Sequence, residues 1–336
     1  MNNNQPAIWF PTVQCGTGTD VFTINLVEAL NQQGIRAEIT WLPHRAEYLP
    51  WSVPIPKPPE WANIVHINTW LHPRFIPENL SVIATLHHSI HDSALKPYKG
   101  LARSLYHDIW IKYIERHTMQ RANTVVAVSQ FTAKIAQQYV LNRPMEVIYN
   151  GVDTEKFKPA QGKQKPHTPF KLLYIGSWMK RKGVDLLEPI MKDLGENYVL
   201  YFTGKQSAEL EQKNMPDNMV DIGHLSQDEV MNAMQQADAL LFPTRNEGFG
   251  LVAIEAQACG LPVVTTNSSA LPEVVQHGKT GFLCDKNDVQ SFVEAIRTLK
   301  ETKGLQKELS LNARLYTENN FKIDKMVHQY VEVYGM

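Results

Sequence analysis

The stretch ALLFPTRNEGFGLVAIEAQACGLPVVT, residues 239–265, decides the fold class of this chain. It contains a short apolar run, Ala239–Phe242, then a turn with two glycines, an apolar helical segment, Leu251–Ala258, and a second apolar run, Pro262–Thr265. Short buried strands that alternate with helices are typical of parallel sheets with crossover helices. The stretch therefore predicts a strand–helix–strand unit of an α/β protein.

The same alternation continues in both directions along the chain. Further strands are predicted at Ala7–Phe10, Arg36–Leu42, Ile64–Ile67, Val82–Leu86, Thr124–Val128, Glu146–Ile148, Phe170–Ile175, Val199–Thr203 and Phe282–Cys284. Residues 153–169 lose this periodicity and contain three prolines, which is typical of an interdomain connection. We expect doubly wound domains at 1–152 and 170–320, a linker at 153–169, and a C-terminal helix in 321–336 that packs back on the N-terminal domain.

The composition excludes several classes of protein. With 336 residues the chain is long enough for two cores, and its 43% hydrophobic and 20% charged residues are typical of a globular protein. A net charge of −1 gives no reason to expect a nucleic-acid partner. Three cysteines do not suggest a disulfide framework, so we expect a cytoplasmic location, and the sequence leaves open a peripheral contact with the inner face of a membrane.

The turn after the strand Ala239–Phe242 carries the clearest chemical signal. A helix that starts behind Gly248 and Gly250 offers unpaired backbone N–H groups and the positive end of its dipole, which suit a phosphate. Glu247 lies in this turn and Glu255 lies about one turn into the helix. Since carboxylates repel phosphate, we expect them to accept hydrogen bonds from sugar or ribose hydroxyls.

A second strand-to-helix turn carries cations. Lys180, Arg181 and Lys182 follow the strand Phe170–Ile175 and precede a predicted helix. Positive charge at this place would stabilise a diphosphate leaving group without a metal. Taken alone, however, such a run is more typical of a solvated loop.

Two features of the first half also lie at the ends of predicted strands. Gly16 and Gly18 follow the first strand and would let the backbone approach a ligand, but Val21 breaks the G-x-G-x-x-G pattern of dinucleotide sites. His87 and His88 follow the strand Val82–Leu86. A single histidine at such a place is usually structural, so these residues alone leave the role open.

The spacing of Glu247 and Glu255, E-x7-E, together with the surrounding segment, resembles the donor site of glycosyltransferase family 4. The resemblance implies a GT-B fold, in which two Rossmann-like domains face a central cleft. It implies sugar contacts for Glu247 and His87, ribose contacts for Glu255, and phosphate contacts for Lys182. The backbone at Gly248, Phe249, Gly250 and Leu251 and the glycines Gly16, Gly18 and Gly176 would complete the donor site. Many members have arginine where this chain has Ser177, and Arg181 is expected to supply that charge.

The resemblance further implies a retaining, hexose-transferring enzyme of glycan biosynthesis that uses a nucleotide-diphosphate sugar, UDP- or GDP-linked, as substrate and no cofactor. No metal is expected, since no D-x-D triplet is present and no His or Cys spacing suggests zinc. The acceptor would be a glycan, a glycolipid or another hydroxyl compound. Two alternatives remain open: a sugar-nucleotide epimerase of GT-B fold, and a non-catalytic nucleotide-sugar-binding protein.

Overall fold

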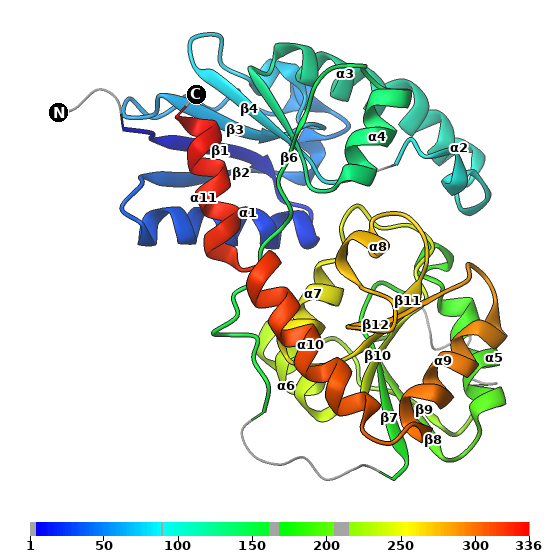
Figure 1. Cartoon of the computed structure of the whole chain (residues 1–336). Helices are drawn as coiled ribbons and strands as arrows, with labels where there is room; N and C mark the ends of the chain where they lie inside the picture. Colours follow the sequence, from blue (N-terminus) through cyan, green and yellow to red (C-terminus); the bar gives the residue numbers. More distant parts are fainter. Residues whose placement is uncertain (1–4, 89, 161–167, 205–214, 336) are drawn as a thin grey trace. The chain divides into compact units, whose positions relative to one another are not determined.

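The computed structural model describes residues 5–88, 90–160, 168–204 and 215–335. These residues form two compact units, 1–151 with 323–336 and 152–322, and each is described by itself. Each unit contains one parallel sheet with helices between its strands, so the predicted pair of doubly wound α/β domains is confirmed (Figure 1).

The sheet of the first unit has the strand order β2-β1-β3-β4-β5-β6, and every pair is parallel. Its strands are β1 (Ile8–Val13), β2 (Ala37–Leu42), β3 (Ile64–Asn68), β4 (Ser81–Leu86), β5 (Thr124–Ala127) and β6 (Glu146–Val147). The order reverses between β1 and β3, and in such sheets ligands bind beyond the carboxyl ends of the strands at this switch point.

Helices cover this sheet along its length. They are α1 (Gly18–Gln32), α2 (Leu101–Leu105), α3 (Lys112–Arg121), α4 (Gln130–Tyr139) and α11 (Ile323–Tyr334), with short 3-10 turns at His44–Ala46, Pro50–Ser52, Pro73–Phe75 and Ser93–Tyr98. A π-helical segment, Tyr106–Ile111, joins α2 to α3, so Leu101 to Arg121 form one continuous helix that is wider in its middle.

The last helix, α11, belongs to the first unit although it ends the chain. It packs against α1, and the hydroxyl of Tyr334 lies 2.6 Å from His66 Nδ1 in β3. Tyr330 in the same helix lies 3.1 Å from the hydroxyl of Thr85 in β4. These buried polar contacts, surrounded by apolar side chains, fix α11 on the sheet.

The sheet of the second unit has the strand order β12-β11-β10-β7-β8-β9, and it too is parallel throughout. Its strands are β7 (Phe170–Tyr174), β8 (Tyr198–Phe202), β9 (Met219–Asp221), β10 (Ala239–Phe242), β11 (Val263–Thr266) and β12 (Gly281–Cys284). Its helices are α5 (Val184–Leu194), α6 (Gln227–Gln236), α7 (Leu251–Ala258), α8 (Leu271–Val274), α9 (Val289–Glu301) and α10 (Leu305–Asn320), with a 3-10 turn at Lys180–Lys182. Helix α5 packs on α9, and α7 packs on α10 (Figure 1).

The chain passes from the first unit to the second at Gly151 and returns at Ile323. The described parts of the expected linker, 153–160 and 168–169, therefore lie within the second unit, and residues 161–167 lie outside the described residues. Arg314 of α10 explains this placement, since its guanidinium donates to the carbonyl oxygens of Thr154 at 3.0 Å and Phe157 at 2.8 Å.

Candidate active site

The strand order of the second unit reverses between β7 and β10, which lie side by side. The turn after β7 contains the predicted cations, and the turn after β10 contains Glu247. Since parallel strands end at the same edge of a sheet, the topology brings both turns to the place where open α/β sheets bind ligands.

The two turns meet at an ion pair between Lys182 and Glu247. Lys182 Nζ lies 2.5 Å from Glu247 Oε1, and the two side chains are only 16% and 11% exposed. The hydroxyl of Thr244 donates to the same carboxylate oxygen at 2.8 Å. Burial disfavours the charged form of Glu247, but the charges of Lys182 and Arg181 and these hydrogen bonds outweigh it and hold its pKa below the usual value. The site therefore contains an ionised carboxylate beside a cation.

The predicted cation Arg181 also contacts the turn after β10. Its guanidinium donates to the carbonyl oxygen of Asn246 at 2.9 Å, and its own carbonyl oxygen accepts the N–H of Arg245 at 3.0 Å. Lys180 is exposed. Arg181 and Lys182, but not Lys180, are thus held beside the glutamate.

Sequence reasoning missed Arg245, which is almost fully buried in the same turn. Its guanidinium donates to both carboxylate oxygens of Asp185 in α5, at 2.6 and 2.9 Å, and to Asn287 Oδ1. Burial opposes ionisation of Asp185, but the hydrogen bonds and charge of Arg245 lower its pKa. Such bidentate pairs are rigid, so Arg245 fixes one turn on the other and acts as a positioning residue.

Two glycines have conformations or neighbours that a side chain would not tolerate. Gly183 has φ +75°, and a Cβ built on it would lie 2.0 Å from the carbonyl oxygen of Pro243. Gly250 has φ +109° immediately before α7. The close approach of the two turns and the start of α7 therefore depend on these glycines.

The remaining predicted donor-site residues of this unit lie around the two turns. Gly248 is partly exposed, whereas Phe249 is buried and its ring packs edge-on against Phe321 at 5.6 Å. Leu251 begins α7. Gly176 follows β7 and its N–H donates to Thr203 Oγ1 at 3.2 Å. Only the backbone of Phe249 is thus left for the predicted contact with the donor.

Glu255 lies in the second turn of α7 and is partly buried. Burial raises the pKa of its carboxyl from 4.5 to about 7, and the charge of Lys156 only partly opposes this. Unlike Glu247, it therefore changes its protonation near neutral pH.

In the first unit the loop that contains Gly16 is held by hydrogen bonds to Asp20. The carboxylate of Asp20 accepts the N–H groups of Cys15 at 3.0 Å and Gly16 at 2.7 Å. Gly16 has φ +66°, and Gly18 is the first residue of α1. The N–H of Gly16 is therefore engaged within the loop, while Gly18 lies at the start of a helix.

His87 directly follows β4 and is buried. Its ring packs edge-on against Phe22 of α1, with 4.6 Å between the ring centroids. Burial, with the nearby His88 and His66, lowers its pKa well below 6.5, so the ring is neutral. The exposed His88 lies 3.5 Å from the hydroxyl of Thr19. Both histidines thus lie against α1, whose first residue is Gly18.

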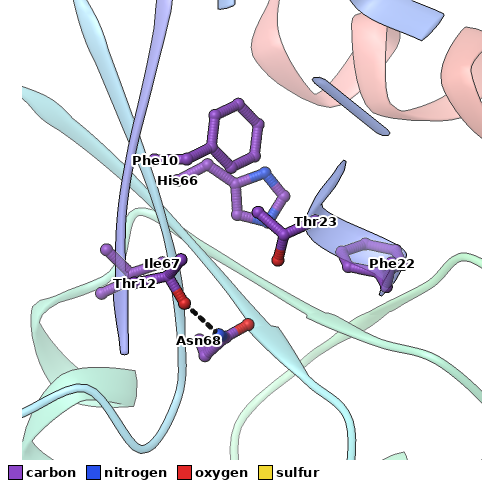
Figure 2. A pocket seen from close by; sticks show the side chains of 7 residues that line it. All are labelled: Phe10, Thr12, Phe22, Thr23, His66, Ile67 and Asn68. Carbon is purple, nitrogen blue, oxygen red and sulfur yellow. Dashed lines mark hydrogen bonds between the residues drawn. The ribbon is translucent and has the colours of Figure 1, made fainter. Parts of the chain in front are cut away.

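A small cavity lies between α1 and the strands β1 and β3 of the same unit (Figure 2). Its volume is about 10 Å³, and it is lined by Phe10, Thr12, Phe22, Thr23, His66, Ile67 and Asn68. Asn68 Nδ2 donates to Thr12 Oγ1 across its wall at 2.9 Å. Such a space holds about one water molecule, so it is not a sugar site.

Comparisons with known proteins find related sequences for both halves of the chain. Residues 155–316 match the profile of the family "Glycosyl transferases group 1", and residues 59–156 match "Glycosyltransferase Family 4". An uncharacterized glycosyltransferase of Methanocaldococcus jannaschii is 31% identical over 226 residues, which cover 66% of this chain and 62% of that protein. The N-acetyl-alpha-D-glucosaminyl L-malate synthase of Bacillus anthracis is 28% identical over 284 residues, which cover 80% of this chain and 71% of that protein.

Solved structures share the fold over almost the whole chain. Sucrose-phosphate synthase from Thermosynechococcus elongatus has a TM-score of 0.78 at 18% identity and covers 97% of this chain and 98% of its own. HepE from Anabaena, solved in complex with UDP and glucose, has a TM-score of 0.75 at 17% identity and covers 98% of this chain and 99% of its own. The chain spans less than two thirds of the first two curated relatives it matches. With matching profiles in both halves and two parallel α/β units, the chain belongs to the family 4 type of glycosyltransferases, which have the GT-B fold.

Proposed function

We propose that this chain is a retaining glycosyltransferase that moves a hexose-type sugar from a nucleotide-diphosphate donor to a hydroxyl acceptor. The observation that carries the proposal is the ion pair of Lys182 and Glu247 at the switch point of the second sheet. A diphosphate and a sugar present the two partners that these side chains prefer, anionic oxygens for the ammonium and hydroxyl donors for the carboxylate.

In the proposed reaction the sugar C1 bond to the phosphate oxygen breaks, and a bond from C1 to the acceptor oxygen forms on the same face of the ring. The acceptor's proton moves to the departing phosphate, so no side-chain nucleophile is needed. Lys182, Arg181 and the first N–H groups of α7 stabilise the negative charge that develops on the leaving group. Glu247 and neutral His87 orient the sugar hydroxyls, Glu255 accepts from the ribose, and no metal is required at the diphosphate.

The donor is proposed to be UDP- or GDP-linked, and the complexes of HepE with UDP and with UDP and glucose favour UDP. A thermal-shift panel with UDP, GDP and ADP tests the base, and the nucleotide that raises the melting temperature most identifies it. ADP as the best ligand would contradict this part of the proposal.

Incubation with radiolabelled nucleotide sugars in the absence of acceptor tests the reaction. Slow release of free sugar that retains its configuration and is unchanged by EDTA is expected. Epimerised donor would instead identify an epimerase, and tight binding without turnover would identify a non-catalytic binding protein. Either result overturns the proposal.

We also propose that the acceptor is a glycan or a lipid-linked molecule and that the first unit contacts a membrane surface. Within the described residues, no helix is long and apolar enough to cross a bilayer. However, one face of the helix from Leu101 to Arg121 exposes large apolar side chains at every fourth residue: Leu101 at 92%, Leu105 at 62%, Ile109 at 63% and Tyr113 at 52%. The helix buries residues of its opposite face only from Ile111 to Met119, and α2 buries none, so the row lies on the solvent side of the helix.

The surroundings of this row favour an anionic lipid surface. Residues 96–121 contain six Lys or Arg against two acidic residues, and one of these, Glu115, is buried beside His91 Nε2 at 2.6 Å. The segment after β2 has six prolines from Pro43 to Pro59 and contains Trp51, which is 68% exposed. Its ring lies 5.8 Å from that of Trp110, which belongs to the helix that carries the row. Exposed apolar side chains flanked by cations are typical of helices that lie in a membrane interface.

Co-sedimentation with vesicles tests this contact. The wild type should bind vesicles of anionic phospholipid and bind neutral phosphatidylcholine vesicles weakly. A Leu105→Ser/Ile109→Ser variant should lose most of this binding. The matched control is Leu311→Ser/Leu315→Ser in α10, where two exposed leucines have the same spacing, and it should bind as the wild type does. Equal binding by the first variant would contradict the proposed surface.

A further inference from the structure

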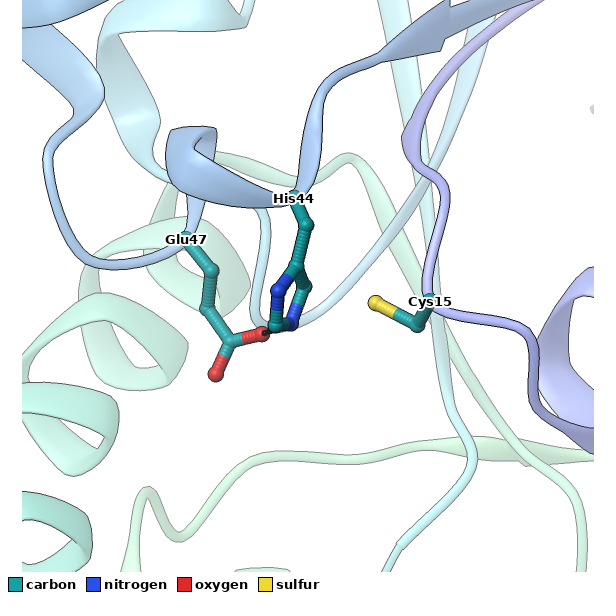
Figure 3. A group of neighbouring side chains, drawn as sticks. All are labelled: Cys15, His44 and Glu47. Atoms are coloured by element: carbon teal, nitrogen blue, oxygen red, sulfur yellow. Dashed lines mark ion pairs between the residues drawn. The ribbon is translucent and has the colours of Figure 1, made fainter.

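Three potential metal ligands meet beyond the carboxyl ends of β1 and β2 in the first unit (Figure 3). Cys15 follows β1, and His44 and Glu47 follow β2. The last residues of the two strands, Val13 and Leu42, are register partners, so the segments that follow them start side by side. The thiol, an imidazole nitrogen and a carboxylate oxygen all lie within 4.8 Å of one another.

The spacing of these atoms is close to that of a tetrahedral zinc site. Zn–S and Zn–N or Zn–O bonds of about 2.3 and 2.1 Å separate neighbouring ligand atoms by roughly 3.3 to 3.8 Å. His44 Nε2 and Glu47 Oε2 are already 3.6 Å apart. The thiol therefore needs to move by only about 1 Å to complete the set. The side chain of His44 is 63% exposed, so it is free to adjust and an ion can reach it.

Further residues hold Glu47 and the backbone of Cys15 in place. The hydroxyl of Tyr106 donates to Glu47 Oε1 at 3.1 Å, which leaves Oε2 facing His44. Trp110 Nε1 donates to the carbonyl oxygen of Glu47 at 3.0 Å, and the N–H of Cys15 donates to Asp20 at 3.0 Å. In metal sites such outer hydrogen bonds orient the ligands and are typically worth 10- to 100-fold in affinity.

The local charge also suits a cation. The carboxylate of Glu47 lies within 4.8 Å of the Cys15 thiol, and the carboxylate of Asp20 accepts the N–H of Cys15. A divalent ion would neutralise this negative charge and displace the proton of the thiol. Thiolate, imidazole and carboxylate together are ligands that zinc accepts, whereas calcium and magnesium prefer oxygen alone.

We propose that Cys15, His44 and Glu47 bind one zinc ion, with Tyr106 as a positioning residue for Glu47. Three protein ligands leave the fourth position for water or an oxygen of another ligand, as in zinc sites that take part in binding or catalysis. All three ligands lie in the first unit, whereas Lys182 and Glu247 lie in the second, and the metal proposal does not depend on the proposed transfer reaction.

Cobalt(II) is the probe that reports the ligands directly. The full-length protein, reduced and stripped of metal with a chelator, is titrated with CoCl₂ and then with ZnCl₂. One equivalent of cobalt should give a thiolate-to-cobalt absorption band in the near ultraviolet and the intense visible bands of tetrahedral cobalt. Zinc should abolish both with a stoichiometry of one.

The chain provides matched controls for each ligand. Cys15→Ser should lose the thiolate band, whereas Cys259→Ser and Cys284→Ser, which alter the two buried cysteines, should keep it. His44→Ala and Glu47→Gln should each weaken zinc binding at least about 100-fold, and Tyr106→Phe about 10-fold. His328→Ala removes a histidine of α11 that faces Glu332 at 3.5 Å, and it should have no effect.

Two results would overturn the proposal. One is the absence of a thiolate band in the wild type at saturating cobalt. The other is a band that survives in Cys15→Ser, which would assign the metal to another cysteine. Circular dichroism of each variant confirms that it is folded, so a loss of binding reports the site and not the fold.

Discussion

The ammonium group of Lys182 lies 2.5 Å from Glu247 Oε1, although 65 positions separate the two residues in the sequence. One side chain follows β7 and the other follows β10, and only the neighbouring position of these strands brings them together. Each charge thus compensates the other. A donor bound as proposed would replace this pairing with phosphate and hydroxyl contacts.

Removing one partner of this ion pair by substitution should lower both stability and activity. Lys182→Met leaves the carboxylate of Glu247 buried with Thr244 and Arg181 as its remaining partners, so the free energy of unfolding should fall by about 1–3 kcal/mol. The double variant Lys182→Met/Glu247→Gln removes the uncompensated charge and should recover part of this loss. Urea unfolding at pH 7 measures both values.

In the same variants sugar transfer should fall by about 100-fold or more, because a group that stabilises the leaving phosphate is missing. The double variant should stay inactive although its stability recovers. Lys180→Met, which alters the exposed neighbour, is the control and should retain transfer. Wild-type transfer rates in Lys182→Met would rule out its proposed role.

Gly183→Ala should disrupt the contact between the two turns of the second unit. The added Cβ would lie 2.0 Å from the carbonyl oxygen of Pro243, so the backbone must move and stability should fall by at least about 2 kcal/mol. The control is Gly304→Ala, since Gly304 also precedes a helix with positive φ but has no atom within 4 Å of its Cβ position among the described residues. Gly304→Ala should lower the free energy of unfolding by only about 1 kcal/mol. Equal melting temperatures for the two variants would refute the clash.

Glu255 should make the protein less stable as the pH rises toward 7. Its pKa is about 7 in the folded protein against 4.5 without burial, so the folded chain keeps a proton that the unfolded chain has lost. Between these two pH values stability therefore falls with rising pH, by at most about 3 kcal/mol. Glu255→Gln should raise the melting temperature at pH 8 and leave it nearly unchanged at pH 4.5. A variant that is less stable than the wild type at pH 8 would contradict the burial of this carboxyl.

His66 should contribute to unfolding in acid. Burial lowers its pKa from 6.5 to about 3, so below pH 6.5 the unfolded chain binds a proton that the folded chain does not. Stability is therefore lost as the pH falls from 6.5 toward 3, by up to roughly 5 kcal/mol. His66→Gln should flatten this part of the pH profile without removing it, because His87 is also buried and neutral.

Urea unfolding of the wild type and of His66→Gln between pH 7 and pH 4 measures the slope with which the free energy of unfolding falls as the pH falls. The control is His328→Gln, whose side chain is 76% exposed and whose loss should leave the slope unchanged. His66→Gln is expected to be less stable at pH 7, because it loses contacts of 2.6 Å to Tyr334 and 2.7 Å to Thr85. An unchanged slope in this variant would show that His66 titrates normally.

In the second half of the chain, the sequence predicts some helices and strands but not others, such as α10. The glycine turns and apolar runs predicted β7, β10, β11 and α7, since strand and turn preferences are local. Leu305–Asn320 was not predicted as a helix, because its buried face consists of only a few small or apolar residues, such as Leu309 and Ala313. The three-residue strand β9 was also missed, because it is too short to show a period.

In the candidate sites, too, some residues could be predicted from the sequence and others could not. The types of residue at the turns after β7 and β10 were visible in the sequence, and they predicted a place for a diphosphate and a sugar. The bidentate pair of Arg245 with Asp185 was not visible, since 60 positions separate the two residues. Cys15 and His44 have no recognisable metal-ligand spacing, and only the adjacency of β1 and β2 brings them within reach of one ion.

By itself, then, the sequence determined the α/β alternation, the glycine turns and the chemical groups placed at strand ends, because these depend on backbone preferences and hydrophobic periodicity over a few residues. The tertiary structure decided which strands are neighbours and hence which side chains pair, are buried and shift their pKa. The pairing of Lys182 with Glu247 illustrates why local sequence patterns cannot predict such contacts. Hydrogen bonds between β7 and β10 fix distances between segments that no local pattern encodes.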